Sequence, residues 1–170
     1  MTKIGKRIIV IGCPGSGKTT FSKKLSAING YPVFHLDAVW HKPDKTHIER
    51  SEFDSALSEI MCRDAWIIDG NYTRTIGKRL EICDTAILFD LPTDVCIKGA
   101  EARLGRERAD IPWVETELNP TFRAEIENFR EKALPGIYEL LEKYKEMVRV
   151  IVFKDRKEAD RFLYGLKARD

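Results

Sequence analysis

The feature that most constrains this chain is a glycine-rich stretch near its beginning, which reads Gly-Cys-Pro-Gly-Ser-Gly-Lys-Thr-Thr over residues 12–20. It fits the spacing G-x-x-x-x-G-K-[ST], which is typical of a phosphate-binding loop. A short apolar run precedes the stretch, and Phe21, Leu25 and Ile28 follow it at the spacing of an amphipathic helix. Because the pattern stands between a buried strand and a helix, the sequence predicts that the chain binds a nucleoside triphosphate.

Each residue type in this loop has a physical part in holding a polyphosphate. Glycines let backbone N–H groups face phosphate oxygens because no Cβ obstructs the approach, and the helix that follows points its positive end at the same anion. Lys18 is expected to reach the β- and γ-phosphates, and the hydroxyl of Thr19 is expected to bind Mg²⁺. The predicted cofactors are therefore ATP and Mg²⁺. The predicted nucleotide-binding residues are Gly12, Gly15, Ser16, Gly17, Lys18, Thr19 and Thr20.

Strand-like and helical patterns alternate along the whole chain, which predicts an α/β fold with a parallel sheet and helices on both faces. At 170 residues the chain has the size of one domain. In an open parallel sheet, ligands bind at the carboxyl ends of the strands. The phosphate-binding loop and three acids that follow strand-like runs are therefore expected along one rim of the sheet. The acids are Asp37, Asp69 and Asp90.

Two segments interrupt the regular pattern of a single domain that spans residues 1–170. We expect an acceptor-side insertion at about 38–64, which begins with a polar loop over 38–46, and a lid at about 105–118. Their positions suit closure over an acceptor and over ATP, respectively.

Capping signals predict where several helices begin or break. Thr46 and Glu49 have the spacing of a capping box, so a helix is expected to start there. The pair Asn119-Pro120 predicts another helix start, and the pair Pro135-Gly136 is expected to break or kink that helix. Asp155 with Glu158 predicts the start of the last helix.

Two of the rim acids have candidate chemical roles. Asp69 follows the third strand-like run, where an acid can hold Mg²⁺ through water, although Asp-Gly is also ordinary turn chemistry. Asp37 follows the second run, a position that resembles that of the aspartate with which hydroxyl-phosphorylating P-loop kinases hold or deprotonate the acceptor alcohol, and the same role is expected of it here. The alternatives for Asp37 are a cap at the end of the strand and a residue in the second coordination shell of the metal. Trp40, with His41, is expected near the acceptor, and a position on the surface is the equal alternative.

Two arginines instead favour an acceptor that carries a phosphate group. An acceptor phosphate is already ionised and needs cations rather than a base. The string Asp-Gly-Asn-Tyr-Thr-Arg at 69–74 resembles the Asp-Gly-Phe-Pro-Arg signature of nucleotide kinases, which nominates Arg74 for that task, with Arg79 as the competing choice. Either arginine is equally consistent with a solvated position on a helix. The sequence therefore leaves an alcohol and a phosphate open as the acceptor.

Three arginines gather at the entrance to the predicted lid, where they would stabilise the charge that develops in phosphoryl transfer. A solvated, charged helix end is the alternative, because acidic residues stand among them. The predicted catalytic residues are Lys18, Asp37, Arg103, Arg106 and Arg108.

Three stretches together resemble a known family: residues 12–20, Phe-His-Leu-Asp at 34–37, and Trp-Ile-Ile-Asp-Gly-Asn-Tyr at 66–72. The pattern is similar to the bacterial DNA topology modulation proteins, the FlaR-type group of adenylate-kinase-like P-loop proteins. The resemblance implies the P-loop nucleoside-monophosphate-kinase fold, with five parallel strands in the order 2-3-1-4-5 and a mobile lid. The chain departs from the group in two places. The relatives usually have Trp-Lys-Pro-Gly-Trp where residues 41–45 read His-Lys-Pro-Asp-Lys, and the lid lacks the longer basic form.

Net charge, the lengths of apolar runs and the cysteine spacing indicate which classes of partner and which location to expect. The net charge is +2, and charges of both signs alternate along the chain, so a nucleic-acid partner is not favoured. No apolar run is long enough to cross a membrane, and the four cysteines have no metal-ligand spacing, which favours a reducing, cytoplasmic location. We therefore expect an ATP- and Mg²⁺-dependent phosphotransferase with an unidentified small-molecule or nucleotide acceptor. The alternative is an ATP-binding regulator of DNA topology, with slow ATPase activity and no small-molecule acceptor.

Overall fold

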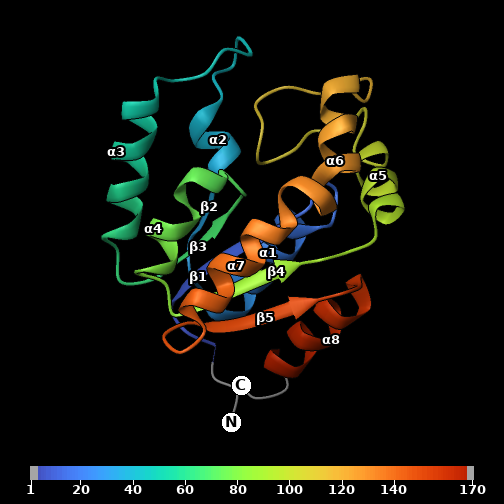
Figure 1. Ribbon diagram of the computed structural model, residues 1–170. Helices are drawn as coiled ribbons and strands as arrows, with labels where there is room; N and C mark the ends of the chain where they lie inside the picture. The colour runs from blue at the N-terminus through green and yellow to red at the C-terminus, as the bar shows by residue number, and fades with distance from the viewer. Residues whose placement is uncertain (1–3, 168–170) are drawn as a thin grey trace.

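The core of the protein is a five-stranded sheet, which the computed structural model describes within residues 4–167 (Figure 1). All four strand pairs are parallel, and the strand order is β2-β3-β1-β4-β5. The predicted fold class and strand order are both confirmed. The strands are β1 (Arg7–Gly12), β2 (Val33–His35), β3 (Trp66–Asp69), β4 (Thr85–Phe89) and β5 (Arg149–Phe153).

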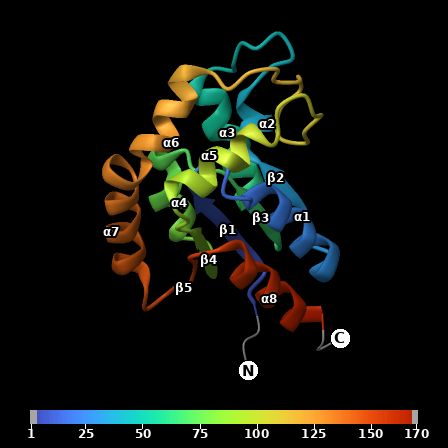
Figure 2. The ribbon, with the colours of Figure 1, turned by 90° about the vertical axis from the view of Figure 1, so that its right-hand side faces the viewer.

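Helices cover both faces of this sheet (Figures 1 and 2). Helices α1 (Lys18–Asn29) and α8 (Arg156–Lys167) pack together on one face, and α4 (Ile76–Leu80) and α7 (Leu134–Tyr144) pack together on the other. Because both faces are covered, the strands β1, β3 and β4 are almost entirely buried, as parallel strands usually are.

The remaining helices lie around the carboxyl ends of the strands. Helices α5 (Thr93–Glu101) and α6 (Pro120–Lys132) pack against each other, and α2 (Leu36–Trp40) contacts α3 (Arg50–Met61) beyond β2. Figure 1 shows that the α2–α3 and α5–α6 connections both lie at the end of the molecule toward which β1 and β3 point. The two irregular segments of the sequence therefore face the same end of the sheet.

A cluster of phenylalanine rings fixes the first helix to the sheet. Phe21 of α1 meets Phe89 of β4 edge to face, with ring centroids 5.3 Å apart, and meets Phe153 of β5 at 5.5 Å. Such aromatic pairs add stability beyond the apolar area that they bury. The packing holds the start of α1, and hence the phosphate-binding loop before it, at a fixed height above β1 and β4.

The acceptor-side segment differs from its prediction in two details. Residues 36–40 form the short helix α2, so Asp37 lies in the first turn of a helix and part of the predicted loop is helical. Helix α3 begins at Arg50, and its capping box uses Glu49 and Glu52. Thr46 instead donates its hydroxyl proton to Asp44, at 2.5 Å. The prediction chose the wrong pair because two acceptable capping residues stand three positions apart.

The predicted break near Pro135 exists, but it comes before the proline. Helix α6 ends at Lys132 and α7 begins at Leu134, which places Pro135 in the first turn of α7. A proline in a first helical turn costs nothing, because the backbone N–H that it lacks would have no partner there. The predicted start at Asn119 is confirmed, since its side chain accepts a hydrogen bond from the Thr121 amide at 2.8 Å.

Candidate active site

A cavity of about 840 Å³ opens at the carboxyl ends of the strands. The phosphate-binding loop, α2, the loop after β3, the end of α5, the residues 105–119 and the start of α8 all contribute to its wall. Most of the predicted site residues therefore meet in one place. Those that line the cavity are Gly15, Ser16, Gly17, Lys18, Thr19, Thr20, Asp37, Trp40, Asp69, Arg103, Arg106 and Arg108.

The loop backbone has the conformation that an anion cradle requires. Gly15 and Gly17 have φ angles of +81° and +105°, which residues with a Cβ rarely adopt. A Cβ on Gly15 would lie 2.0 Å from the carbonyl oxygen of Cys96, so α5 also excludes any side chain there. The hydroxyl of Ser16 is buried and has no partner among residues 4–167. A polar group without a hydrogen-bond partner, in a loop shaped by glycines, fits a site for a bound polyphosphate.

Lys18 and Arg156 converge on the same loop. The ammonium of Lys18 donates to the carbonyl oxygens of Gly12 and Cys13, at 2.8 and 2.9 Å. Burial lowers the pKa of Lys18, and the nearby carboxylate of Asp69 opposes that shift. Arg156, at the start of α8, donates to the carbonyl oxygen of Gly15 at 2.9 Å. The sequence analysis missed Arg156, because nothing in its surroundings marks it as a neighbour of a loop 140 residues earlier.

Asn71 fixes the beginning of the loop. Its side-chain oxygen accepts from the Gly12 amide at 2.9 Å, and its side-chain nitrogen donates to the Gly12 carbonyl at 2.8 Å. This two-bond clamp ties the end of β1 to the loop after β3. Asn71 was quoted in the family resemblance, but its role depends on the pairing of β1 with β3, which the local sequence does not display.

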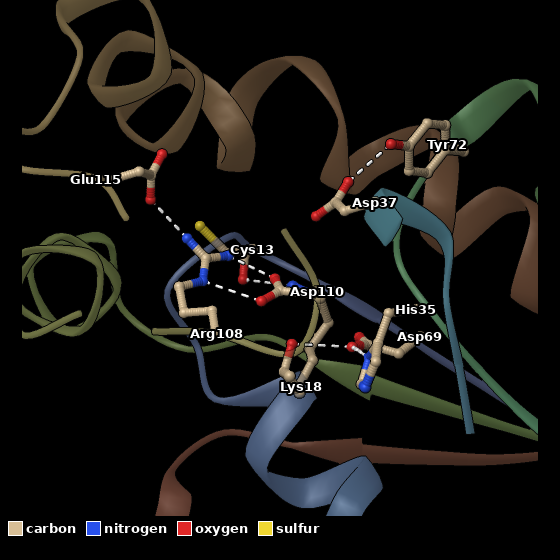
Figure 3. A network of polar contacts seen from close by, with 10 residues as sticks. Cys13, Lys18, His35, Asp37, Asp69, Tyr72, Arg108, Asp110 and Glu115 are labelled. Carbon is tan, nitrogen blue, oxygen red and sulfur yellow. Dashed lines mark hydrogen bonds and ion pairs between the residues drawn. The ribbon is translucent and has the colours of Figure 1, made fainter. Parts of the chain in front are cut away.

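Asp69 lies at the centre of a polar chain beside the loop (Figure 3). Thr19 donates its hydroxyl proton to Asp69 Oδ2 at 2.9 Å, and His35 Nδ1 lies 2.8 Å from the same oxygen. A threonine hydroxyl next to a carboxylate offers the hard oxygen ligands that Mg²⁺ prefers. Thr19 could bind the ion directly and Asp69 through water. His35, whose side chain is only 11% exposed, would keep the carboxylate oriented.

Asp37 forms a second polar pair farther along the cavity. The hydroxyl of Tyr72 donates to Asp37 Oδ1 at 2.7 Å (Figure 3). Burial raises the pKa of Asp37, the hydrogen bond from Tyr72 opposes this, and the charges of Asp110 and Asp69 raise it further. Tyr72 has a φ angle of +39°, and its ring stacks on Phe53 at 4.9 Å. The strained backbone and the stacking both hold the hydroxyl against Asp37.

The two predicted acceptor cations do not line the cavity. Arg79 is completely buried and donates to the carbonyl oxygens of Gly70 and Asn71 and to the Thr75 hydroxyl. Burial lowers its pKa to about 10. Arg79 therefore stabilises the loop after β3 from the protein interior, by hydrogen bonds to its backbone.

Arg74 is engaged at a different place. Its guanidinium forms a two-bond pair with Asp54 of α3, at 2.6 and 3.1 Å, and the pair is solvent-exposed. Arg74 thus links the 3-10 helix η1 (Thr73–Thr75) to α3 at the protein surface, outside the cavity.

The lid arginines have three different environments. Arg108 donates to Asp110 at 3.0 Å and to Glu115 at 2.6 Å, both on the same segment (Figure 3). Burial alone would lower the pKa of Arg108, but the hydrogen bond and charge of Asp110, together with the charges of Glu115 and Asp37, raise it. Arg103 is half-buried, burial lowers its pKa, and its Nε has no partner in the described part of the chain. Arg106 is exposed at the cavity wall.

Comparison with curated proteins finds distant relatives. The sequence is 26% identical over 127 residues to adenylate kinase of Thermotoga petrophila and 27% identical over 128 residues to that of Thermotoga maritima. Each match covers 56% of this chain and 57% of the relative, so the chain spans little more than half the length of these proteins. No family model matches the sequence.

Solved structures resemble nearly the whole chain. They include a gluconokinase from Sinorhizobium meliloti (TM-score 0.53, 14% identity, 99% of this chain and 94% of that one). Shikimate kinase from Bacteroides thetaiotaomicron gives a TM-score of 0.55 at 16% identity, with 96% and 97% covered. Shikimate kinase from Acinetobacter baumannii, in complex with shikimate, gives 0.54 at 15%, with 98% and 95% covered. The chain has the fold of the P-loop kinases.

Proposed function

We propose that the protein is a phosphotransferase that moves the γ-phosphoryl group of ATP to a small acceptor bound near Asp37. The observation that carries the proposal is the convergence of the phosphate-binding loop, Asp69, Asp37 and the lid arginines on one cavity. The likeness to adenylate, gluconate and shikimate kinases supports the same reaction class.

The nucleotide end of the cavity supplies binding and charge. Lys18 and the loop amides would hold the triphosphate, and Lys18 would exchange its two carbonyl partners for phosphate oxygens. Thr19 and Asp69 would hold Mg²⁺, which supplies charge neutralisation between the phosphates when bound. Arg103 would face the transferred phosphoryl, because it lines the same cavity as the phosphate-binding loop. Catalysis on this side is positioning and electrostatic stabilisation.

The acceptor end supplies the base. Asp37 would accept a proton from the attacking hydroxyl, and the hydrogen bond from Tyr72 would keep the carboxylate in place. We also propose that the segments 38–64 and 105–118 act as acceptor-side insertion and lid, and that their closure excludes water from the reaction. The edge-to-face contact of His41 and Trp113, with centroids 5.1 Å apart, already joins the two segments.

Three finer predictions from the sequence stay predictions. They are the membership of the FlaR-type group, the cytoplasmic location, and Mg²⁺ as the metal. None of the helices in the described residues combines the length and apolar character that crossing a bilayer requires.

The proposal is tested with labelled ATP and a panel of nucleoside monophosphates, nucleosides and other alcohols. We expect Mg²⁺-dependent transfer to at least one acceptor. Lys18→Ala should lower the rate by at least about 10³-fold, because the variant loses the charge on the transferring phosphates. Lys145→Ala, which removes an exposed lysine paired with Glu142, is the matched control and should keep the wild-type rate. Slow hydrolysis with no transfer to any acceptor would favour the regulatory alternative instead.

A further inference from the structure

Arg156 stands at the point where strand β5 gives way to helix α8. It is the first residue of α8, and it lines the cavity beside the phosphate-binding loop. Two hydrogen bonds fix the turn around it. The Glu158 amide donates to Asp155 Oδ1 at 2.8 Å, and Glu158 Oε2 accepts from the Lys154 amide at 2.6 Å. Because such reciprocal caps hold the first turn of a helix, the side chain of Arg156 extends from a fixed position.

Two neighbouring N–H groups of Arg156 hold the middle of the loop. Nη2 donates to the carbonyl oxygen of Gly15 at 2.9 Å, and Nε donates to that of Ser16 at 3.3 Å. The planar guanidinium has its donors in a rigid fork, so it fixes both carbonyls at once. Asn71 fixes the start of the loop in a similar way, at Gly12. Side chains from outside the loop therefore hold its backbone at two points.

The carbonyls that Arg156 holds set the direction of two loop amides. A trans peptide unit is planar, and its C=O and N–H groups point in opposite directions. The Gly15 carbonyl shares its peptide unit with the Ser16 amide, and the Ser16 carbonyl shares its unit with the Gly17 amide. Because Arg156 binds both oxygens, both N–H groups face away from it. A hydrogen bond to the oxygen of a peptide unit also polarises the N–H group of that unit.

The Ser16 amide shows where this direction leads. It donates to the carbonyl oxygen of Cys13 at 3.2 Å, and the ammonium of Lys18 donates to the same oxygen at 2.9 Å. The amide and the ammonium therefore converge inside the loop. The backbone amides and the lysine of a phosphate-binding loop are the groups that bind phosphate oxygens. Arg156 thus orients, from outside the loop, donors that face the expected phosphate site.

Helix α5 leaves room for this contact. A Cβ on Gly99 would lie 2.0 Å from the Gly15 carbonyl oxygen and 2.4 Å from Arg156 Nη2. Both distances are far below van der Waals contact, so any side chain at this position would displace the guanidinium or the loop. A glycine inside a helix lowers the stability of that helix. Here its missing side chain allows the arginine to reach the loop.

We propose that Arg156 is a positioning residue for the triphosphate. It holds the peptide units 15–16 and 16–17 with their N–H groups toward the phosphates, and it acts through the loop rather than by contact with the nucleoside. The proposal rests on the nucleotide-binding function proposed above and adds to that site a residue that the loop motif does not contain.

Calorimetry on the full chain tests the proposal with two probes, a non-hydrolysable ATP analogue and inorganic tripolyphosphate, each with Mg²⁺. Tripolyphosphate has the phosphate chain of ATP without the nucleoside. Arg156→Met loses both hydrogen bonds, and we expect it to bind both probes about 10-fold more weakly, by the same factor. A loss confined to the ATP analogue would assign Arg156 to the nucleoside and overturn the proposal. Unchanged affinity for both probes would overturn it too.

Two further variants separate the hydrogen bonds from the charge. Arg161→Met removes the same charge from an exposed position on α8 outside the cavity wall, and it should leave both affinities unchanged. Arg156→Lys keeps the charge but lacks the fork of donors, so we expect it to recover only part of the lost affinity. Full recovery in Arg156→Lys, or an equal loss in Arg161→Met, would show that charge alone acts and would contradict the positioning role.

A melting curve without ligand separates positioning from a general loss of structure. Arg156 is exposed, so Arg156→Met should melt within about 3 °C of the wild type. A larger fall in the melting temperature would attribute the weaker binding to the fold and would overturn the proposal.

Kinetics with labelled ATP separate this inference from the kinase function. With an acceptor from the panel above, Arg156→Met should raise the KM for ATP and leave kcat within about two-fold, because the loop holds the phosphates before transfer as well as during it. A fall in kcat at unchanged KM would contradict the proposal. Wild-type protein that binds both probes but transfers to no acceptor would contradict the kinase and leave the role of Arg156 standing. Normal transfer with unchanged binding in Arg156→Met would do the reverse.

Discussion

The two ends of the cavity are built in opposite ways. The phosphate end comes mainly from one continuous stretch, residues 12–20, and recognises its ligand with backbone amides and cations. The acceptor end comes from α2, the loop after β3 and the segment 105–118, and presents rings and carboxylates. The comparison shows that a ligand bound by backbone geometry is encoded locally, whereas a ligand bound by side chains depends on how distant segments meet.

The largest effect that tests this contrast is expected at Asp37. Asp37→Asn removes the proposed base and should lower kcat by about 10²–10⁴-fold, while affinity for ATP stays unchanged because the phosphate end is intact. Rapid quench with labelled ATP measures the rate, and calorimetry measures the affinity. A loss of ATP affinity equal to the loss of rate would show that the two ends are not separate.

The same variant should be more stable than the wild type. Burial raises the folded-state pKa of Asp37 above its usual value of 3.8, so the folded protein disfavours the ionised form. The free energy of unfolding therefore falls as pH rises from 3.8 through the raised pKa of the folded state. Asparagine removes that penalty at neutral pH and can still accept from Tyr72. We expect a higher melting temperature at pH 7, with the difference fading as pH falls toward 3.8. A lower melting temperature at pH 7 would contradict the burial of this charge.

The next effect separates the two arginines that the sequence placed at the acceptor. Arg79→Leu leaves the buried carbonyls of Gly70 and Asn71 unpaired and should cost about 3 kcal/mol of unfolding free energy. Arg74→Ala breaks only an exposed pair and should change neither stability nor the acceptor KM. Urea titration and steady-state kinetics measure both. A raised acceptor KM in Arg74→Ala would restore its predicted role as an acceptor cation.

The smallest expected effect concerns Tyr72. Its hydrogen bond favours the ionised form of Asp37, so Tyr72→Phe should raise the pKa of Asp37 further. Because the base must be ionised, the acid limb of the kcat profile should move to higher pH, with only a few-fold loss of rate at its plateau. Tyr138→Phe, which removes a hydroxyl bonded to Asp90 away from the cavity, is the control. An acid limb that stays in place would mean that Tyr72 does not act on Asp37.

The sequence was sufficient for the sheet and for the position of the phosphate-binding loop, but not for Arg156 and Asn71 beside that loop. Asp90, the third predicted rim acid, does not line the cavity and is paired with Arg130. The spacing of the loop and the alternation of strands and helices led to the observed sheet, and Asp37 and Asp69 reach the cavity because parallel strands end at one edge. The loop spacing and the alternation of strand and helix patterns depend on residues close together in the sequence, so they can be recognised without the tertiary structure.

The sequence was not sufficient for the direction of long side chains. Arg79 belongs to the short helix α4, and a helical position is equally compatible with an arginine exposed to solvent. Only the tertiary fold shows that its guanidinium is buried and hydrogen-bonded to the loop after β3. Arg108 carries the charge expected of a catalytic residue, yet it is bonded within the lid segment. Tyr72 was quoted for its place in a motif, while its contact with Asp37 spans 35 residues.

The central claim is that ATP bound in the loop directs its γ-phosphate toward Asp37. A crystal structure with Mg²⁺ and a non-hydrolysable ATP analogue tests it most directly. The account predicts that Lys18 leaves the carbonyls of Gly12 and Cys13 for the β- and γ-phosphates, and that the γ-phosphate faces the part of the cavity that Asp37 lines. A triphosphate bound elsewhere, or a γ-phosphate pointing away from Asp37, would contradict it.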